Sequence, residues 1–362
     1  MVFCIACSCG VKNKIKEGIL SMKKLLALVL TLALTLSLVP GALAVNEDVS
    51  GKVMIYTSMY QFVIDMMKDA MAKEFPNLEV EFFYGGTGSL QTKLTGEMET
   101  GTLGCDMMLV AEPAYSLELK EGGWLEPIEI ENAADRLRFE FDPEGYWYPV
   151  RVCNMVLAYN PEKYTMDQVP HTFKDFAEDE SLKGVISMGN PLTSGTTMAA
   201  VAALTDKYGY DYLTALGKNS VMIESGSTAL AKLQTGECKA IMILEESVLK
   251  IRKEEGSKLA CIYPEDGNIM IPSTVMTVAE DKSANLNIEA CTAIENWLMT
   301  PEAQDLIMQG YMHSVTKGTT AVPFDSIDTD GLIKTDMGVN WERCYRDREE
   351  IRTQFQERVT VQ

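Results

Sequence analysis

The apolar positions of the chain switch repeatedly between the alternation of strands and the spacing of one helical face. From about residue 52, short apolar runs are each followed by a stretch with helical periodicity. We expect strands over 53–56, 78–84 and 106–110, a helix capped by Ser58 that runs to about 75, and helices over 90–100 and 114–121. This order predicts a mostly parallel sheet with helices on both faces.

Two long stretches of strand character, 146–159 and 269–279, enclose a second alternating series. Strands are expected there over 185–188, 220–223, 239–244 and 259–263, with helices that begin at Ser194, Ser227 and Glu245. Further helices are expected over 290–299, after Pro301, and over 341–358.

This pattern predicts an α/β protein of two lobes, each a mostly parallel sheet flanked by helices, joined by two crossover strands that serve as hinges. Lobe one would comprise residues 45–150 plus 272–362, including a C-terminal helical tail, and lobe two residues 151–271.

The N-terminal segment has the order of a secretory signal peptide. Lys23 and Lys24 precede an apolar run over 25–39, and Ala42-Leu43-Ala44 follows Pro40-Gly41. The run is shorter than the roughly 20 residues of a membrane span. We expect residues 1–44 to be a leader, with Met22 as its natural start, and the protein to be periplasmic or secreted. No cysteine follows the run at a lipoprotein position.

The charge of the chain excludes several partners. The formal net charge is −20. Residues 1–44 carry five Lys and one Glu, so the remainder holds 27 basic residues (32 minus 5) and 51 acidic residues (52 minus 1), a balance of −24. Such a surface repels nucleic acid and anionic lipid. An anionic ligand would need local dipoles at its site to overcome the unfavourable charge of the whole protein. The six cysteines after residue 44 lack C-x-x-C spacing and cannot be paired from the sequence.

Four turns rich in Ser, Thr and Gly follow predicted strands, two in each lobe. A helix N-terminus offers unpaired N–H groups and a partial positive charge, hydroxyls add donors, and glycine admits a close approach. We expect the four turns to converge on one anion in a cleft between the lobes. The alternative is that each serine or threonine only caps its helix. The candidate ligand-binding residues in these turns are Thr57, Ser58, Thr87, Gly88, Ser89, Ser194, Gly195, Thr196, Thr197 and Ser227.

Two adjacent acids, Glu245 and Glu246, directly follow a predicted strand, so at least one is expected to face the cleft. Glu245 there would accept hydrogen bonds from sugar hydroxyls or pair with an amine. The alternative is a first-turn acid that stabilises its own helix. Glu112 is a further candidate, since a metal ion or a cationic ligand would be held by Glu112, Glu224, Glu245 and Glu246.

Catalytic motifs are missing from the sequence. No G-x-S-x-G segment occurs, and Gly86-Thr87-Gly88 lacks the third glycine of a dinucleotide site. The two histidines, His171 and His313, have no recognisable nucleophile or metal partner and are expected at the surface. We expect no enzyme, no cofactor and no resident metal; an exported hydrolase is the alternative of another class.

Seven segments, in this order, resemble one known family. They are Tyr56-Thr57-Ser58, the turn at 85–89, Ala111–Tyr115, Leu119–Leu125, Ala158–Pro161, Pro191–Thr197 and Trp297–Ala303. The chain is similar over about residues 50–325 to extracellular solute-binding proteins of ABC importers with the type II periplasmic-binding fold, in the branch of ferric-iron, phosphonate and sugar-phosphate receptors.

The resemblance implies a two-lobed clamshell that delivers its ligand to membrane permease subunits, and we expect a monomer. Ferric-iron members carry adjacent tyrosines where this chain has Glu245-Glu246. A small anion is therefore favoured, namely an organophosphate, a sugar phosphate or a phosphonate. Ferric iron, or a cation such as a polyamine, is the alternative.

Overall fold

The computed structural model describes residues 46–284, 286–319 and 322–360. The leader predicted at 1–44 lies outside the described residues. Within the described part, no helix is both long enough and apolar enough to cross a membrane.

One sheet runs through the body formed by Glu47–Gln362, in the strand order β2-β1-β3-β10-β5-β8-β6-β7. The strands at each end of this order are parallel, whereas β10 and β5 in the middle run antiparallel to their neighbours. Two short strands, β4 (Leu125–Glu126) and β9 (Ala260–Ile262), pair with β10 and β5. The main strands are β1 Ser50–Thr57, β2 Asn77–Tyr84, β3 Met107–Ala111, β5 Tyr148–Tyr159, β6 Ile186–Met188, β7 Met222–Ile223, β8 Ala240–Leu244 and β10 Ile269–Val278.

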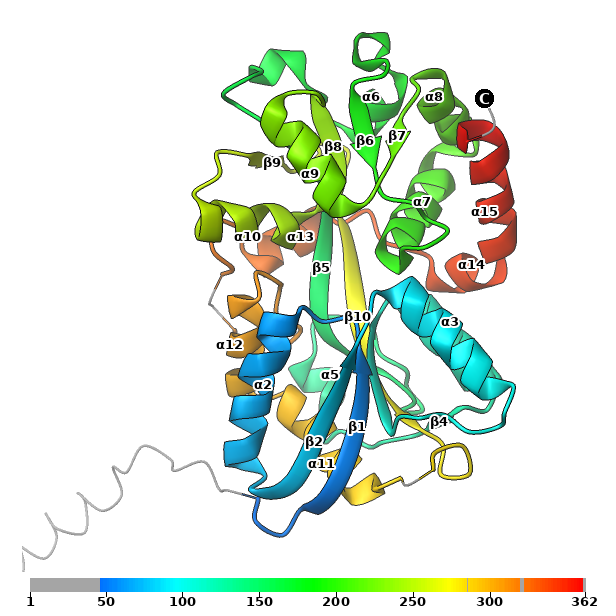
Figure 1. The fold of residues 1–362 in the computed structure, drawn as a ribbon, viewed down its shortest axis with the longest axis vertical. Helices are drawn as coiled ribbons and strands as arrows, with labels where there is room; N and C mark the ends of the chain where they lie inside the picture. The colour runs from blue at the N-terminus through cyan, green and yellow to red at the C-terminus, as the bar shows by residue number, and fades with distance from the viewer. Residues whose placement is uncertain (1–45, 285, 320–321, 361–362) are drawn as a thin grey trace, which may run out of the picture. The chain divides into compact units, whose positions relative to one another are not determined.

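The helices cover both faces of the sheet in each half (Figure 1). In the first half they are α2 Gln61–Glu74, α3 Thr87–Met98, α4 Pro113–Glu121, α5 Ala133–Arg136, α11 Ile288–Leu298 and α12 Pro301–Gln309. In the second half they are α6 Phe173–Glu178, α7 Gly195–Tyr208, α8 Asp211–Lys218, α9 Gly226–Thr235 and α10 Glu245–Glu255. The chain ends with α13 Thr329–Thr335, α14 Trp341–Arg346, α15 Arg348–Phe355 and the single turn η3 Gln356–Thr360.

The two long strands β5 and β10 join the two lobes, as the sequence predicted. All their residues are buried. Val150 and Val152 of β5 pack in the lobe-one core, whereas Met155 and Leu157 of the same strand pack in the lobe-two core. Figure 1 shows both strands passing through the middle of the molecule. The fold is therefore a two-lobed α/β clamshell with two crossover strands.

Two local expectations differ from the structure. Ser58 does not cap a helix: α2 begins three residues later, after Tyr60, and no side chain caps it. The C-terminal tail was expected with lobe one, but its buried residues Cys344, Ile351 and Phe355 belong to the lobe-two core. Cys344 lies on α14, and Ile351 and Phe355 lie on α15; these two helices pack beside α7 and α8 (Figure 1).

Candidate functional site

A cavity of about 460 Å³ lies at the carboxyl ends of the neighbouring parallel strands β8, β6 and β7. Its wall is made by the segments that directly follow these strands and by the first turns of α7 and α9. Ligands bind at this edge of open α/β sheets because loops and helix N-termini meet there. The polar residues of the wall all come from lobe two: Asn190, Thr193, Ser194, Thr196, Thr197, Glu224, Ser225 and Ser247.

Ser194 is the N-cap of α7 and lines the cavity. Its hydroxyl oxygen accepts a hydrogen bond from the Thr197 N–H at 3.2 Å and lies 3.2 Å from the Thr196 hydroxyl. The cap orients the first turn so that its backbone donors, which have no partner within a helix, are available at the wall. Thr196 and Thr197 also line the cavity, whereas Gly195 does not.

The first turn of α9 faces the same cavity. Ser225 is its N-cap and accepts a hydrogen bond from the Thr228 N–H at 3.2 Å. Ser225 and Gly226 line the cavity, and Ser227 lies beside them with its hydroxyl 3.1 Å from that of Ser225. The helix thus begins one residue earlier than the sequence predicted. Two helix N-termini, with their partial positive charges, meet at one cavity.

One acid, Glu224, also lines the cavity, but its charge is matched. Its carboxylate lies 2.5 Å from the Lys232 ammonium on α9 and accepts a hydrogen bond from Ser187 at 3.2 Å. The pair leaves the neutral hydroxyls and the two helix dipoles as the features that would select a ligand.

The turns of lobe one do not line this cavity; the turn at 86–89 lies against the start of α7 instead. A Cβ built on Gly88 would lie only 2.3 Å from the Thr193 carbonyl oxygen, and one built on Gly195 would lie 2.9 Å from Thr87. The first turns of α3 and α7 are therefore in direct backbone contact across the lobes. Gly88 and Ser89 line a second cavity, of about 470 Å³, on the side of α15.

Thr57 and Ser58 take structural positions at the end of β1. The Thr57 hydroxyl is buried, donates to the Leu109 carbonyl at 3.0 Å and accepts from the Met59 N–H at 3.1 Å. The Ser58 hydroxyl accepts a hydrogen bond from the Arg151 guanidinium at 3.3 Å.

Glu112 lies at the contact between the lobes. Its backbone has φ of 81°, in the left-handed region, and its side chain is 1% exposed. A carboxylate oxygen lies 3.5 Å from the Arg348 guanidinium of the C-terminal tail. Burial raises the pKa of Glu112 to about 7, against the opposing effect of Arg348. Its carboxylate is thus occupied by the tail.

Glu245 does not face the cavity, contrary to expectation. Its side chain is 1% exposed, lies 3.0 Å from the His313 ring and accepts hydrogen bonds from Tyr263 at 2.5 Å and Asn154 at 3.2 Å. Burial disfavours the charged carboxylate, yet bonds from His313, Ser326 and Tyr263 lower its pKa. The partners of Glu245 lie on segments that are distant in the sequence. The position of Glu245 directly after a strand therefore could not predict where its side chain points.

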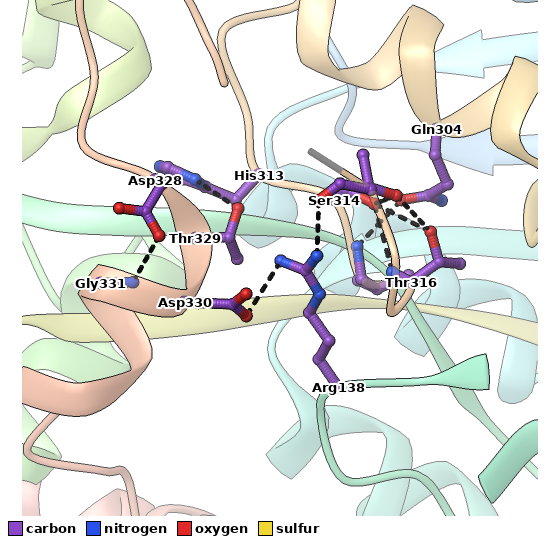
Figure 2. A network of polar contacts seen from close by, with 11 residues as sticks. Arg138, Gln304, His313, Ser314, Thr316, Asp328, Thr329, Asp330 and Gly331 are labelled. Carbon is purple, nitrogen blue, oxygen red and sulfur yellow. Dashed lines mark hydrogen bonds and ion pairs between the residues drawn. The ribbon is translucent and has the colours of Figure 1, made fainter. Parts of the chain in front are cut away.

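The expectation that His313 lies at the surface is wrong as well. The ring is buried, with one nitrogen at Glu245 and the other 3.2 Å from the Thr329 hydroxyl. Figure 2 shows the contact of His313 with Thr329 and, beside it, the pair of Arg138 with Asp330 at 3.4 Å. Arg138 also donates to the Thr319 carbonyl at 2.7 Å. The network fixes the segment after α12 against lobe two's α10. His171, by contrast, is partly exposed, and a ring nitrogen lies 3.6 Å from Glu265.

Arg151 on β5 was not predicted from the sequence. Its side chain is 4% exposed, donates to Ser58 and to the Met312 sulfur, and has an Nε without a partner. Among the described residues it forms no ion pair with a carboxylate. Opposite it on β10, the buried Ser273 hydroxyl also lacks a partner. A lone charged residue in a mostly apolar crossover strand is the signal that could have found it.

Three of the four acids considered for a cation have separate charged partners: Glu224 pairs with Lys232, Glu112 with Arg348 and Glu245 with His313. The fourth, Glu246, is buried, and burial raises its pKa against the opposing effects of Cys153 and Arg151. Within the described ranges, no group of three or more His, Cys, Asp or Glu side chains could hold a metal ion.

The fold and the position of the cavity define a solute-binding protein. The family model described as bacterial extracellular solute-binding protein matches residues 44–335, and the chain belongs to this family. This confirms the resemblance seen in the sequence, to the solute-binding receptors of ABC importers with the type II fold. A protein of Haemophilus influenzae described as uncharacterized is 24% identical over 309 residues, which cover 81% of this chain and 86% of that protein.

Three solved structures share the fold. Iron-bound HitA from Pseudomonas aeruginosa is 20% identical, with a TM-score of 0.73 and coverage of 84% of this chain and 98% of that one. AfuA from Actinobacillus pleuropneumoniae, with fructose-6-phosphate bound, is 19% identical, with a TM-score of 0.73 and coverage of 87% and 100%. A periplasmic thiamin binding protein is 16% identical, with a TM-score of 0.71 and coverage of 88% and 99%. At these identities the likeness shows the fold alone.

Proposed function

We propose that this protein captures a small anionic solute and delivers it to the permease subunits of an ABC importer. The solute classes that we favour are organophosphates, sugar phosphates and phosphonates. The observation that carries the proposal is that the first turns of α7 and α9 line one cavity of about 460 Å³.

The chemistry of this wall favours a negatively charged group. Two helix N-termini present backbone donors and partial positive charge, and Ser194, Thr196, Thr197 and Ser225 add hydroxyls. Hydrogen bonds to a charged group contribute about 1.5–3 kcal/mol each. Such local donors are needed because the chain as a whole carries a net charge of −20.

Closure of the two lobes would complete the site. The turn at 86–89 already lies against the start of α7 in this structure, and bending at β5 and β10 would separate the lobes to admit or release the solute. Arg151 lies between these lobes on β5. Its buried guanidinium forms no ion pair within the part of the chain that the structure describes, although its charge lowers the pKa of the buried Glu246.

The solved relatives leave two ligand chemistries in competition. AfuA is bound to fructose-6-phosphate, whereas HitA is bound to iron. This chain has Glu245-Glu246 where ferric-iron members carry adjacent tyrosines, and Glu245 is occupied by His313. We therefore favour the phosphorylated or phosphonate solute. We further propose a periplasmic or secreted monomer that binds and releases its solute without catalysis.

A thermal-shift panel tests the proposal. The panel contains fructose 6-phosphate, glycerol 3-phosphate, methylphosphonate and inorganic phosphate, with ferric citrate, spermidine and thiamin as competing classes. A solute that binds only the folded state adds about 2.7 kcal/mol at 100 times its Kd. We expect at least one phosphate or phosphonate compound to raise the melting temperature. A rise with ferric citrate or spermidine, and with no anion, would refute the anionic assignment.

A further inference from the structure

The C-terminal tail, Trp341–Thr360, consists of α14, α15 and η3. It lies outside the segment matched by the family model, which ends at residue 335. The tail holds five of the nine arginines of the chain, although the protein is strongly acidic: Arg343, Arg346, Arg348, Arg352 and Arg358. Arginine forms geometrically defined pairs with carboxylates, so the partners of these five residues indicate what the tail does.

One side of the tail is fixed to lobe two. Its three buried residues belong to the lobe-two core. Arg343 donates to the Ala202 carbonyl on α7 at 2.7 Å, and Arg358 donates to the Thr214 hydroxyl on α8 at 2.8 Å. Apolar burial and these bonds together mean that the tail moves with lobe two.

The opposite side of the tail holds a single helix of lobe one, α4. This helix packs through Tyr115 in the same core as β3, whereas its Ala114 lies in the buried cluster that contains Cys344 of the tail. Arg346 donates to the Glu121 carboxylate at 2.7 Å, and the Tyr345 hydroxyl donates to the same carboxylate at 3.1 Å. The bonds to Glu121 are exposed, so solvent and salt reach them.

A second group of bonds lies deeper in the same contact. Arg348 pairs with Glu118 at the surface and lies 3.5 Å from the buried carboxylate of Glu112. Glu112 in turn precedes α4 and touches the first turn of α7 at Gly195. The ion pairs of the tail therefore reach the point where the two lobes meet.

We propose that the tail is an electrostatic latch, carried by lobe two, that holds α4 of lobe one and so biases the protein toward the closed arrangement. The latch rests on the proposed function, because it requires lobes that open and close. Its strength is set by the pairs that the tail makes with Glu112, Glu118 and Glu121. A tail that merely covers lobe two would need no bonds to lobe one.

Two matched variants test the latch. Glu118→Gln/Glu121→Gln removes the exposed carboxylates on α4, which are 43% and 45% exposed, and leaves the tail itself unchanged. Asp206→Asn removes a carboxylate that is 52% exposed and lies 3.6 Å from Arg343, a pair between the tail and lobe two only. Because all these side chains are exposed, both variants should fold, and their melting curves check this.

Small-angle X-ray scattering on the unliganded full chain, at salt concentrations from about 0.05 M to 1 M, supplies the readout, because salt screens exposed pairs. We expect the radius of gyration of the wild type and of Asp206→Asn to rise with salt. The double variant should already have the larger radius at low salt, with a closed-to-open ratio lowered about two- to tenfold.

The proposal is overturned if the double variant scatters like the wild type at every salt concentration, or if Asp206→Asn expands as much as the double variant. A second series adds fructose 6-phosphate or inorganic phosphate to the wild type. Failure of both compounds to compact it counts against the anionic solute, whereas the salt series, which uses no ligand, decides the latch separately.

Discussion

The contact between Gly88 and Thr193 makes a specific prediction for Gly88→Ala. A Cβ at position 88 would lie 2.3 Å from the Thr193 carbonyl oxygen, whereas 3.4 Å is the lower limit of ordinary contact. The first turns of α3 and α7 would have to separate by about 1 Å, because backbone atoms at such a distance repel strongly. Since the two turns belong to different lobes, the substitution should oppose closure.

The effect on stability should have the opposite sign from the effect on binding. Gly88 lies in the first turn of α3, and alanine is favoured over glycine in helices by about 0.5–1 kcal/mol. Gly96 lies in the same helix, and a Cβ there would meet nothing within 4 Å. Gly96→Ala therefore measures the helical gain alone and serves as the control.

Calorimetric titration and urea unfolding of both variants provide the assay. We expect both to be at least as resistant to urea as the wild type. Gly88→Ala alone should bind the solute found in the thermal-shift panel about tenfold or more weakly, which corresponds to roughly 1.4 kcal/mol or more. Equal affinities of Gly88→Ala, Gly96→Ala and wild type would show that the α3–α7 contact is not part of the bound state.

Four further substitutions test other parts of the account. Ser194→Ala should weaken anion binding about tenfold or more, because a hydroxyl of the cavity wall is lost. It should also lower the free energy of unfolding by about 0.5–2 kcal/mol, because α7 loses its N-cap. Ser89 lines the other cavity, so Ser89→Ala should retain affinity in the same titration. Glu295 is buried with a hydrogen bond from Thr277, and burial raises its pKa to about 8, so its contribution to stability falls as pH rises from about 4.5 to 8. Glu295→Gln should remove this fall in urea unfolding series at pH 5, 6.5 and 8; an unchanged slope would contradict it. Arg151→Met should weaken anion binding and leave urea resistance equal or higher, because it replaces a buried guanidinium that forms no ion pair among the described residues with an apolar side chain. A large loss of stability would mean that Arg151 is mainly structural.

The sequence predicted the parts of the fold that depend on local pattern. The strand β8 and the helix after it appear where the change from strand to helical period placed them, and Ser194 caps α7 as its position before a helical stretch suggested. Ser58 shows the limit of this reasoning, since an equally good cap residue instead accepts a bond from Arg151, which is 93 residues away along the chain. Whether a serine caps a helix depends on such tertiary competitors.

The site itself could be predicted only in part. The turns of lobe two meet at one cavity because the carboxyl ends of parallel strands share one edge of the sheet. The direction of Glu245 could not be predicted, because its partner His313 is 68 residues away and both are buried only by tertiary packing. The contact of Gly88 with Thr193 depends in the same way on how the lobes pack.

The identity of the solute tests the central claim most directly. The protein would be purified gently from the host, and mass spectrometry would identify the small molecules that are then released from it. We predict a phosphorylated or phosphonate compound that is bound by the wild type and lost from Ser194→Ala. A ferric ion or a polyamine bound in its place, equally in the wild type and in Ser194→Ala, would contradict the account.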